Sequence, residues 1–444
     1  MDPHNYPLPP GVHRIPDHLL DLRSDNEIDQ DILHPKPITS EKNIFFFWHS
    51  GFGNMHPYTQ RNVRSWYRRF SRQGWNILVM NRQPGSRLNV ANYLDISDPQ
   101  IFPRAFVDGT IGGDYAPQHT SDLVRWPLLL KYGGVYADVG LMQIGDLDRL
   151  WSETVGNPES RFEVLSYNCG GVEDRRLANY FLACGKGNPL FARCHRLFLE
   201  LWAAEGGKTS TEGMYRSRLL RGAPIFPGGG TEVLEEKSAK DEGRREGYAK
   251  EGDAHVVNAS VETAHEGDDK DDIIKVTPEE LSRMLTDYII QGHVLTLVMG
   301  LVDEEDGWNG PKYSAEHVFG IEYMVGSQLI NEYTEWDGQR AFQLMSLPMP
   351  KDGEAESDDQ KNAREIVEAC LSKSFGFKLA HGLILKVHGP TLGSLWRGNP
   401  GSDDVPGTYA HWLRYGMKFW CPDEPPLCQE YQEIEPYKIG PLLR

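Results

Sequence analysis

The sequence has no apolar run long enough to cross a membrane. The apolar stretch 289–302 is interrupted by Gln291, Gly292 and His293, and it is shorter than the ~20 residues that a spanning helix needs. The first residues also lack the basic start and the small-residue cleavage site of a secretory signal. These absences predict a protein without a membrane span and favour a cytoplasmic location.

Cysteine and basic residues are scarce as well. The six cysteines show no metal-ligand spacing and fit the reduced thiols of a cytosolic protein, although Cys421 and Cys428 could pair. The 64 acidic and 46 basic residues give a formal net charge of −18, so a broad surface for a phosphate backbone is not expected. We therefore exclude nucleic acid as a partner, and nothing in the sequence sets the oligomeric state.

What the sequence does contain is an alternation of strand and helix patterns. Residues 43–49 and 75–80 read as buried strands on either side of a helix at 57–74. A second helix, 121–132, ends at a Gly-Gly pair and leads into a strand at 135–138. This order predicts an α/β fold of Rossmann type, with a mostly parallel sheet flanked by helices.

The composition divides the chain into four parts. Residues 1–40 read as an extended N-terminal arm, and 41–231 as the nucleotide-binding core. The segment 232–272 is highly charged and almost free of aromatic residues, which predicts a disordered acidic insertion. Residues 273–444 are expected to complete the catalytic domain with helical additions, including a helical pattern over 316–331.

The block 116–151 carries the strongest signal for chemistry. Asp122 and Arg125 lie three residues apart, hence on one side of the predicted helix, where they could pair or reach a phosphate. Alternatively, Asp122 is an acid of the first helical turn, capped by Ser121 or Thr120. Asp138 ends the following strand, where a carboxylate can hold Mg²⁺ or Mn²⁺ against phosphate oxygens, or can simply close the strand at a turn.

This block resembles the donor-site core of glycosyltransferases that include capsular-polysaccharide-synthesis-like proteins and Och1-type mannosyltransferases, especially their fungal relatives. The shared pattern is Ser-Asp-x-x-Arg, then Tyr-Gly-Gly-Val-Tyr, then an aspartate cluster, and here it runs from Ser121 to Asp138. The resemblance covers about residues 43–200. It implies a GT-A fold, a nucleoside diphosphate sugar as donor, a divalent metal at the diphosphate and retention of anomeric configuration.

One departure from the family pattern concerns the metal. The family's Asp-x-Asp reads Asp138-Val139-Gly140 here, so the second carboxylate is missing and the motif is degenerate. Gly140 would let the backbone approach the diphosphate closely, and Asp146 or Asp148 could complete the ligand shell. His388 follows a late apolar strand pattern and is a second candidate metal ligand, or a lone surface histidine.

Four further residues are candidates for binding or catalysis. Trp48 and His49 end the first strand, and nucleotides bind outside the carboxyl ends of parallel strands, so Trp48 could stack on the base or belong to the core. Tyr136 is a candidate donor contact, although tyrosines in such strands are more often core residues. Glu322 lies in an apolar stretch, where a carboxylate must be paired or face a cleft, and it could position the acceptor.

These observations predict a glycosyltransferase that moves a sugar from a nucleoside diphosphate to a hydroxyl acceptor, with Asp138, Asp122 and Glu322 as catalytic candidates. The candidates for donor binding are Trp48, His49, Asp122, Arg125, Tyr136 and Gly140, and those for Mn²⁺ or Mg²⁺ are Asp138 and His388. One alternative is an enzyme of specialised metabolism that uses the same scaffold to join other activated groups. Another is a non-catalytic protein that binds partners through 232–272.

Overall fold

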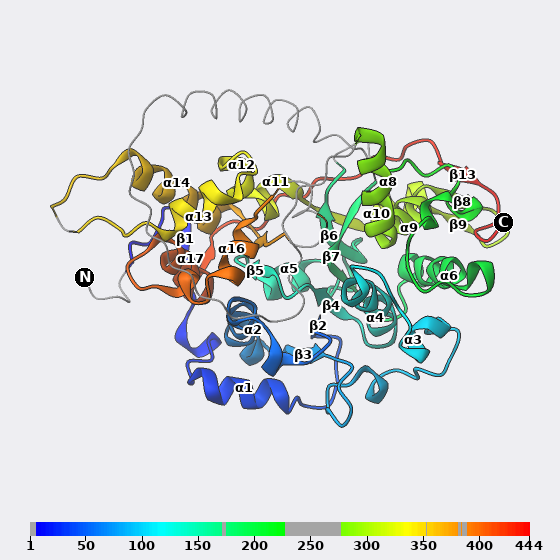
Figure 1. The fold of residues 1–444 in the computed structure, drawn as a ribbon, viewed down its shortest axis with the longest axis horizontal. Helices are drawn as coiled ribbons and strands as arrows, with labels where there is room; N and C mark the ends of the chain where they lie inside the picture. Colours follow the sequence, from blue (N-terminus) through cyan, green and yellow to red (C-terminus); the bar gives the residue numbers. More distant parts are fainter. Residues whose placement is uncertain (1–5, 171–174, 227–276, 352, 381–382, 384–388) are drawn as a thin grey trace.

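The computed structural model describes residues 6–170, 175–226, 277–351, 353–380, 383 and 389–444 (Figure 1). The predicted insertion 232–272 and His388 lie outside the described residues. None of the helices in the described part of the chain combines the length and the apolar character needed to cross a bilayer. All six cysteines are described, and none of them forms a disulfide bond, so Cys421 and Cys428 are not paired.

A six-stranded sheet forms the centre of the molecule, in the spatial order β10-β6-β7-β4-β2-β3. Neighbouring strands are parallel except where β7 pairs with β4 and with β6. This confirms the predicted α/β class with a mostly parallel sheet. The strands are β2 (Asn43–Phe47), β3 (Asn76–Met80), β4 (Gly134–Ala137), β6 (Val164–Asn168), β7 (Leu177–Cys184) and β10 (Val318–Glu322).

Helices cover both faces of this sheet because its strands alternate apolar side chains toward two separate cores. Phe45 and Phe47 pack with helices α4, α6 and α9 on one face, whereas Ile44 and Phe46 pack with α1, α2 and α5 on the other. Figure 1 shows α2 and α4 on opposite sides of β2 and β3. The helices are α1 (Asp25–Leu33), α2 (Pro57–Phe70), α4 (Ala116–Tyr132), α5 (Leu147–Glu153), α6 (Pro189–Ala203) and α9 (Ile290–Met299).

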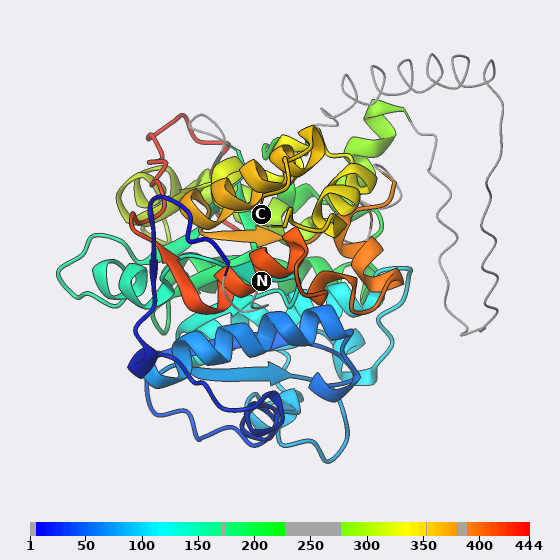
Figure 2. The ribbon, with the colours of Figure 1, turned by 90° about the vertical axis from the view of Figure 1, so that its left-hand side faces the viewer.

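The C-terminal part adds a third core made mostly of helices, as expected for 273–444. Its helices are α12 (Leu329–Tyr333), α13 (Gly338–Ser346), α14 (Asp358–Lys373), α16 (Leu392–Gly398) and α17 (Tyr409–Phe419). Figure 2 shows α17 lying along α2, where buried Arg414 pairs with Asp403 and donates a hydrogen bond to the Tyr58 carbonyl. This layer closes one end of the sheet.

Short strands and helices connect these layers. Strand β5 (Leu141–Gln143) pairs with β11 (Gly376–Lys378), and β1 (Val12–Arg14) pairs with β12 (Trp420–Pro422). The remaining elements are α3 (Arg104–Asp108), α8 (Pro278–Tyr288), α10 (Gly310–His317), α11 (Tyr323–Ser327), β8 (Leu301–Asp303), β9 (Trp308–Asn309) and β13 (Lys438–Ile439). The pairing of β5 with β11 brings the C-terminal part to the end of β4.

Two expectations about local structure are wrong. The N-terminal arm is not extended throughout, because Ser24 and Glu27 form a reciprocal capping box that starts α1. The helical pattern over 316–331 is also interrupted, since Val318–Glu322 forms strand β10 beside β6. A short apolar run reads equally well as helix or strand, and here the pairing partner, which is distant in sequence, decides.

Helix α4 also differs from its prediction. It begins at Ala116, five residues before the expected start, and it continues through Pro127. Asp122 therefore lies in the second turn, and neither Ser121 nor Thr120 caps the helix. The predicted stop is confirmed: Gly133 has φ +65° and Gly134 has φ +107°. A Cβ atom at Gly134 would lie 2.3 Å from the Asn43 carbonyl oxygen, so only glycine fits this close approach of α4's exit to β2.

Candidate active site

A cavity of about 870 Å³ opens at the edge of the sheet where β2, β4 and β6 end. Trp48 and His49 follow β2, Asp138 follows β4, and Asn179 lies near the start of the antiparallel strand β7. Strand ends that meet at one edge bring together side chains from distant parts of the chain. This edge is the place expected for a nucleotide site in an open α/β sheet.

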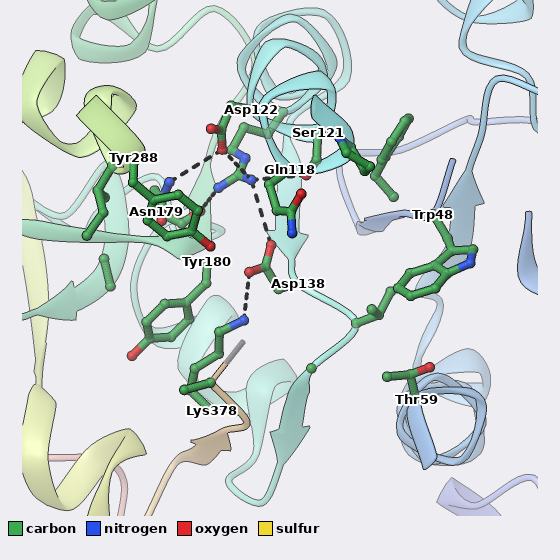
Figure 3. Close-up of a pocket in the computed structure, with 18 of the residues that line it drawn as sticks. Trp48, Thr59, Gln118, Ser121, Asp122, Asp138, Asn179, Tyr180, Tyr288 and Lys378 are labelled. Atoms are coloured by element: carbon green, nitrogen blue, oxygen red, sulfur yellow. Dashed lines mark hydrogen bonds and ion pairs between the residues drawn. The ribbon is translucent and has the colours of Figure 1, made fainter. Parts of the chain in front are cut away.

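One side of the cavity is lined by a chain of charged side chains that runs from α4 to the end of β4 (Figure 3). The Arg125 Nη2 atom lies 2.7 Å from Oδ1 of Asp122 and 3.7 Å from Oδ1 of Asp138. The side chains of Asp122 and Arg125 are 5% and 4% exposed, whereas that of Asp138 is 29% exposed. Asp122 and Arg125 meet because residues three apart share one side of a helix, as the sequence predicts.

Arg125 is fixed by more than its two carboxylates. It donates hydrogen bonds to the Asn179 carbonyl and, at 3.0 Å, to Oγ of Ser121. Its guanidinium carbon lies 4.5 Å from the centroid of the Tyr136 ring. Burial by itself lowers the pKa of Arg125, but the negative charges of Asp122 and Asp138 favour its charged form, and the pKa of Arg125 lies above its usual value. Arg125 is therefore a permanent, preorganised positive charge.

Polar side chains from β7, from α9 and from α4 itself surround Asp122. Asn179 Nδ2 lies 3.4 Å from its Oδ1, and His119 Nδ1 lies 3.4 Å from its Oδ2. Gln291 Nε2 donates to the main-chain carbonyl of Asp122 at 2.9 Å. The two contacts to the carboxylate are long, so Asp122 keeps capacity to accept hydrogen bonds from a ligand in the cavity.

Asp138 meets a second cation on its other side. Lys378 Nζ lies 2.7 Å from Asp138 Oδ2 and 5.3 Å from the centroid of the Tyr180 ring. Asp138 thus sits between a guanidinium and an ammonium group. The described residues at this point do not fit a divalent cation, because the set offers a single carboxylate that already pairs with Lys378. Across the described residues, no group of three histidine, cysteine or acidic side chains could hold a metal ion.

The opposite wall carries Trp48, His49 and Gly140, three of the predicted donor-binding residues, and all three line the cavity. The Trp48 ring packs edge-to-face on His56, with centroids 5.7 Å apart, and remains partly exposed. Burial and the charge of Arg82 lower the pKa of His49, so its imidazole is neutral at pH 7. Gly140 is held in place by its carbonyl, which accepts a hydrogen bond from the Leu379 main chain.

A third wall is apolar and comes from α8. Leu281, Leu285 and Tyr288 line the cavity, together with Ile289 just after the helix. Burial and the nearby charges of Asp122 and Asp138 raise the pKa of the Tyr288 hydroxyl well above its usual value. Tyr288 is therefore a neutral hydroxyl that can donate a hydrogen bond near Asp122.

Three predicted residues lie elsewhere. Tyr136 belongs to the core beneath Arg125, where its hydroxyl lies 2.6 Å from Ser121 Oγ, so it supports the site from behind. Glu322 caps α11 by accepting hydrogen bonds from the Met324 and Val325 main chain, which explains how its carboxylate is paired. Its predicted role at the acceptor has no support in this geometry. His388 lies outside the described residues.

Three residues of the site, Lys378, Asn179 and Tyr288, were not predicted from the sequence. Lys378 and Asn179 are polar residues inside short apolar strands, a pattern that signals a side chain with a special environment. That pattern is visible in the sequence, but it does not tell which strand ends meet. Tyr288 lies at the end of an ordinary amphipathic helix and gives no signal of its own.

A cavity at the carboxyl edge of a mostly parallel sheet, with a fixed Asp-Arg-Asp chain on one wall, is where an active site is expected, and comparison with known proteins gives the class of the protein. A family model described as capsular polysaccharide synthesis protein matches residues 14–208, which include Asp122 and Asp138. O-glycosyltransferase braB of Annulohypoxylon truncatum is 29% identical over 98% of this chain and 91% of its own length.

Two further fungal relatives agree. Glycosyltransferase afumC of Aspergillus fumigatus is 30% identical over 88% of each chain, and probable glycosyltransferase FCK3 of Fusarium pseudograminearum is 30% identical over 89% of this chain and 88% of its own. Among solved structures, PaToxG Glycosyltransferase aligns at 15% identity with a TM-score of 0.28, over 43% of this chain and 70% of that one.

The protein is thus a glycosyltransferase. It belongs to the family of fungal glycosyltransferases related to capsular polysaccharide synthesis proteins. Membership argues against the two alternatives raised by the sequence, a scaffold that joins other activated groups and a non-catalytic binding protein.

Proposed function

We propose that the protein transfers a sugar from a nucleoside diphosphate sugar to a hydroxyl group of a small acceptor. The observation that carries this proposal is the chain of Asp122, Arg125 and Asp138 along one wall of the cavity. Asp122 supplies hydrogen-bond acceptors for sugar hydroxyls, and Arg125 fixes both carboxylates. The similarity to braB, an O-glycosyltransferase, supports a hydroxyl acceptor.

The arrangement of the walls supports one orientation of the donor. In the view of Figure 3, Trp48 lies on one side of Asp138, while Asp122, Asn179 and Tyr288 lie on the other. We place the nucleoside base at Trp48, because indole rings stack on bases, and the diphosphate beside Gly140 and Asp138. The sugar then reaches Asp122 and Asn179, whose amide and carboxylate can both bond to hydroxyl groups.

The apolar wall of α8 supports an acceptor with an apolar body. Leu281, Leu285 and Tyr288 present this surface next to the proposed sugar position. A hydroxyl acceptor that packs against them would place its reactive oxygen near the anomeric carbon. Such positioning is a major source of rate acceleration for group transfer.

We further propose that transfer proceeds with retention, by displacement on the face from which the diphosphate leaves. The two carboxylates that line the cavity, Asp122 and Asp138, are both paired with cations, which makes them poor nucleophiles and bases. In this step the bond from the anomeric carbon to the diphosphate oxygen breaks, and the acceptor oxygen bonds to that carbon. The acceptor proton passes to the departing phosphate oxygen.

The test is incubation of the purified protein with a panel of UDP- and GDP-sugars and a panel of apolar alcohols and phenols. We expect release of the nucleoside diphosphate and a glycosylated acceptor of increased mass. Proton NMR of this product should show that its new glycosidic bond has the same anomeric configuration as the donor sugar. Asp122→Asn should lower turnover by roughly 100-fold or more, as for loss of a polar contact to the reacting group. Asp148→Asn is the matched control, since Asp148 pairs with Lys42 and does not line the cavity. Equal turnover by both variants would refute the proposal.

A further inference from the structure

Lys378 is a charged residue of the cavity to which the proposed function gives no role. It ends β11, and its neighbours Phe377 and Leu379 are buried, so the backbone holds it firmly at the cavity edge. Its side chain is 16% exposed, with the ammonium 2.7 Å from Asp138 Oδ2. Figure 3 shows this side chain directed at Asp138 from the side opposite Asp122.

The Lys378 ammonium lies beside Asp138, where the proposed function puts the donor diphosphate. The diphosphate gains negative charge there when its bond to the sugar breaks, so a nearby positive charge stabilises it. A divalent ion on Asp138 Oδ2 would have to displace Lys378 or lie next to it, and like charges at that distance repel. The position at which the Asp-x-Asp pattern has its second carboxylate is occupied here by Gly140. The donor set at Asp138 therefore favours an ammonium group over a metal ion.

A second cation lines the same cavity. Arg397, on α16, is exposed and lies among the lining residues. Arg125, by contrast, is buried and committed to Asp122 and Asp138. Among the described residues that line the cavity, Lys378 and Arg397 are therefore the cations that a ligand can reach.

We propose that Lys378 neutralises the donor diphosphate in place of a divalent metal, with Arg397 as a second, more mobile charge. This inference rests on the proposed function. When the bond between the sugar and the diphosphate breaks, its electron pair goes to the phosphate oxygen, and the Lys378 ammonium stabilises that negative charge as a hydrogen-bond donor. Lys378 remains protonated throughout, and Asp138 acts as a positioning residue that orients the ammonium.

The experiment is calorimetric titration of the full-length protein with UDP and with GDP, in EDTA and again in Mn²⁺. We expect one of the two nucleotides to bind equally well in both conditions. Lys378→Met should weaken that binding roughly 10- to 100-fold, the effect of losing one charge-assisted hydrogen bond, and Lys378→Arg should restore most of it.

The matched control is Lys42→Met. Lys42 also pairs with an aspartate, Asp148, at 2.6 Å and lies 5.9 Å from a Trp75 ring centroid, but it does not line the cavity. We expect this variant to bind the nucleotide like the unmodified protein. Thermal unfolding of each variant, measured in parallel, separates a loss of binding from a loss of folding.

Two results would overturn the inference while leaving the proposed function intact. One is binding that EDTA abolishes and Mn²⁺ restores in the unmodified protein. The other is a folded Lys378→Met variant with unchanged affinity. The proposed function itself fails in a different way, by the absence of binding of either nucleotide in both conditions.

Discussion

Replacing Arg125 with methionine should destabilise the fold more than any exposed charge substitution. Among the described residues, Arg125 supplies the one guanidinium that pairs with Asp122, whose side chain is 5% exposed. The other described contacts of that carboxylate, to Asn179 and His119, are both 3.4 Å long. Loss of one partner from a buried ion pair costs about 3–5 kcal/mol, because the other charge stays buried without compensation. We expect a loss of that size in the free energy of unfolding.

A double-mutant cycle measured by urea unfolding tests this reasoning. The variant Asp122→Asn/Arg125→Met removes both charges, so it should recover a large part of the stability that Arg125→Met loses. As a control, Lys42→Met breaks a pair that is 31% and 22% exposed and should cost about 1 kcal/mol or less. An Arg125→Met protein that unfolds at the same urea concentration as the unmodified protein would refute the account of Arg125 as a buried structural charge.

Three further predictions concern the base site, pH and the turn after α4. Trp48→Ala should weaken UDP or GDP binding by roughly 10- to 100-fold in a titration, the usual contribution of one base–aromatic stack. Burial lowers the pKa of His195 and of His293 from 6.5 to about 4, so both are neutral in the fold and charged when unfolded below pH 6.5. The free energy of unfolding is therefore unaffected by these two histidines above pH 6.5, and it falls by about 3 kcal/mol for each of them as the pH drops to 4. In urea unfolding, the His195→Gln and His293→Gln variants should show a flatter dependence of this free energy on pH. Gly134→Ala should lower the melting temperature more than Gly187→Ala, because both have positive φ but only Gly134 lacks room for a Cβ atom.

The sequence predicted the parts of this site that are local in the chain. Asp122 and Arg125 share a helix side, and Asp138 directly follows an apolar strand, so spacing and patterning were enough to find them. The sheet class followed from the same alternation of strands and helices. The sequence also allowed Asp122 to be an acid in the first turn of its helix. The structure excludes this interpretation, because α4 begins at Ala116 and Asp122 lies in the second turn.

The rest depends on pairing between distant segments. Lys378 reaches Asp138 because β11 pairs with β5, where Gly376 lies opposite Gln143, 233 residues earlier in the chain. No local pattern encodes that register. Strand β10 was missed for the same reason, since its parallel partner β6 lies far away in sequence. Long-range strand pairing determines which charged side chains come into contact. Here the pairing of β11 with β5 brings Lys378 beside Asp138.

The most direct test of the central claim is a comparison of thermal stabilisation by nucleoside diphosphates and by the corresponding sugar nucleotides. At 100 times the dissociation constant, a ligand stabilises the native state by about 2.7 kcal/mol, which a melting curve resolves. The account predicts that UDP- or GDP-sugars raise the melting temperature beyond the plain nucleotide, and that Asp122→Asn removes this extra increase while keeping the effect of the nucleotide. A sugar-dependent increase that survives in Asp122→Asn, or no increase with any nucleotide, would contradict it.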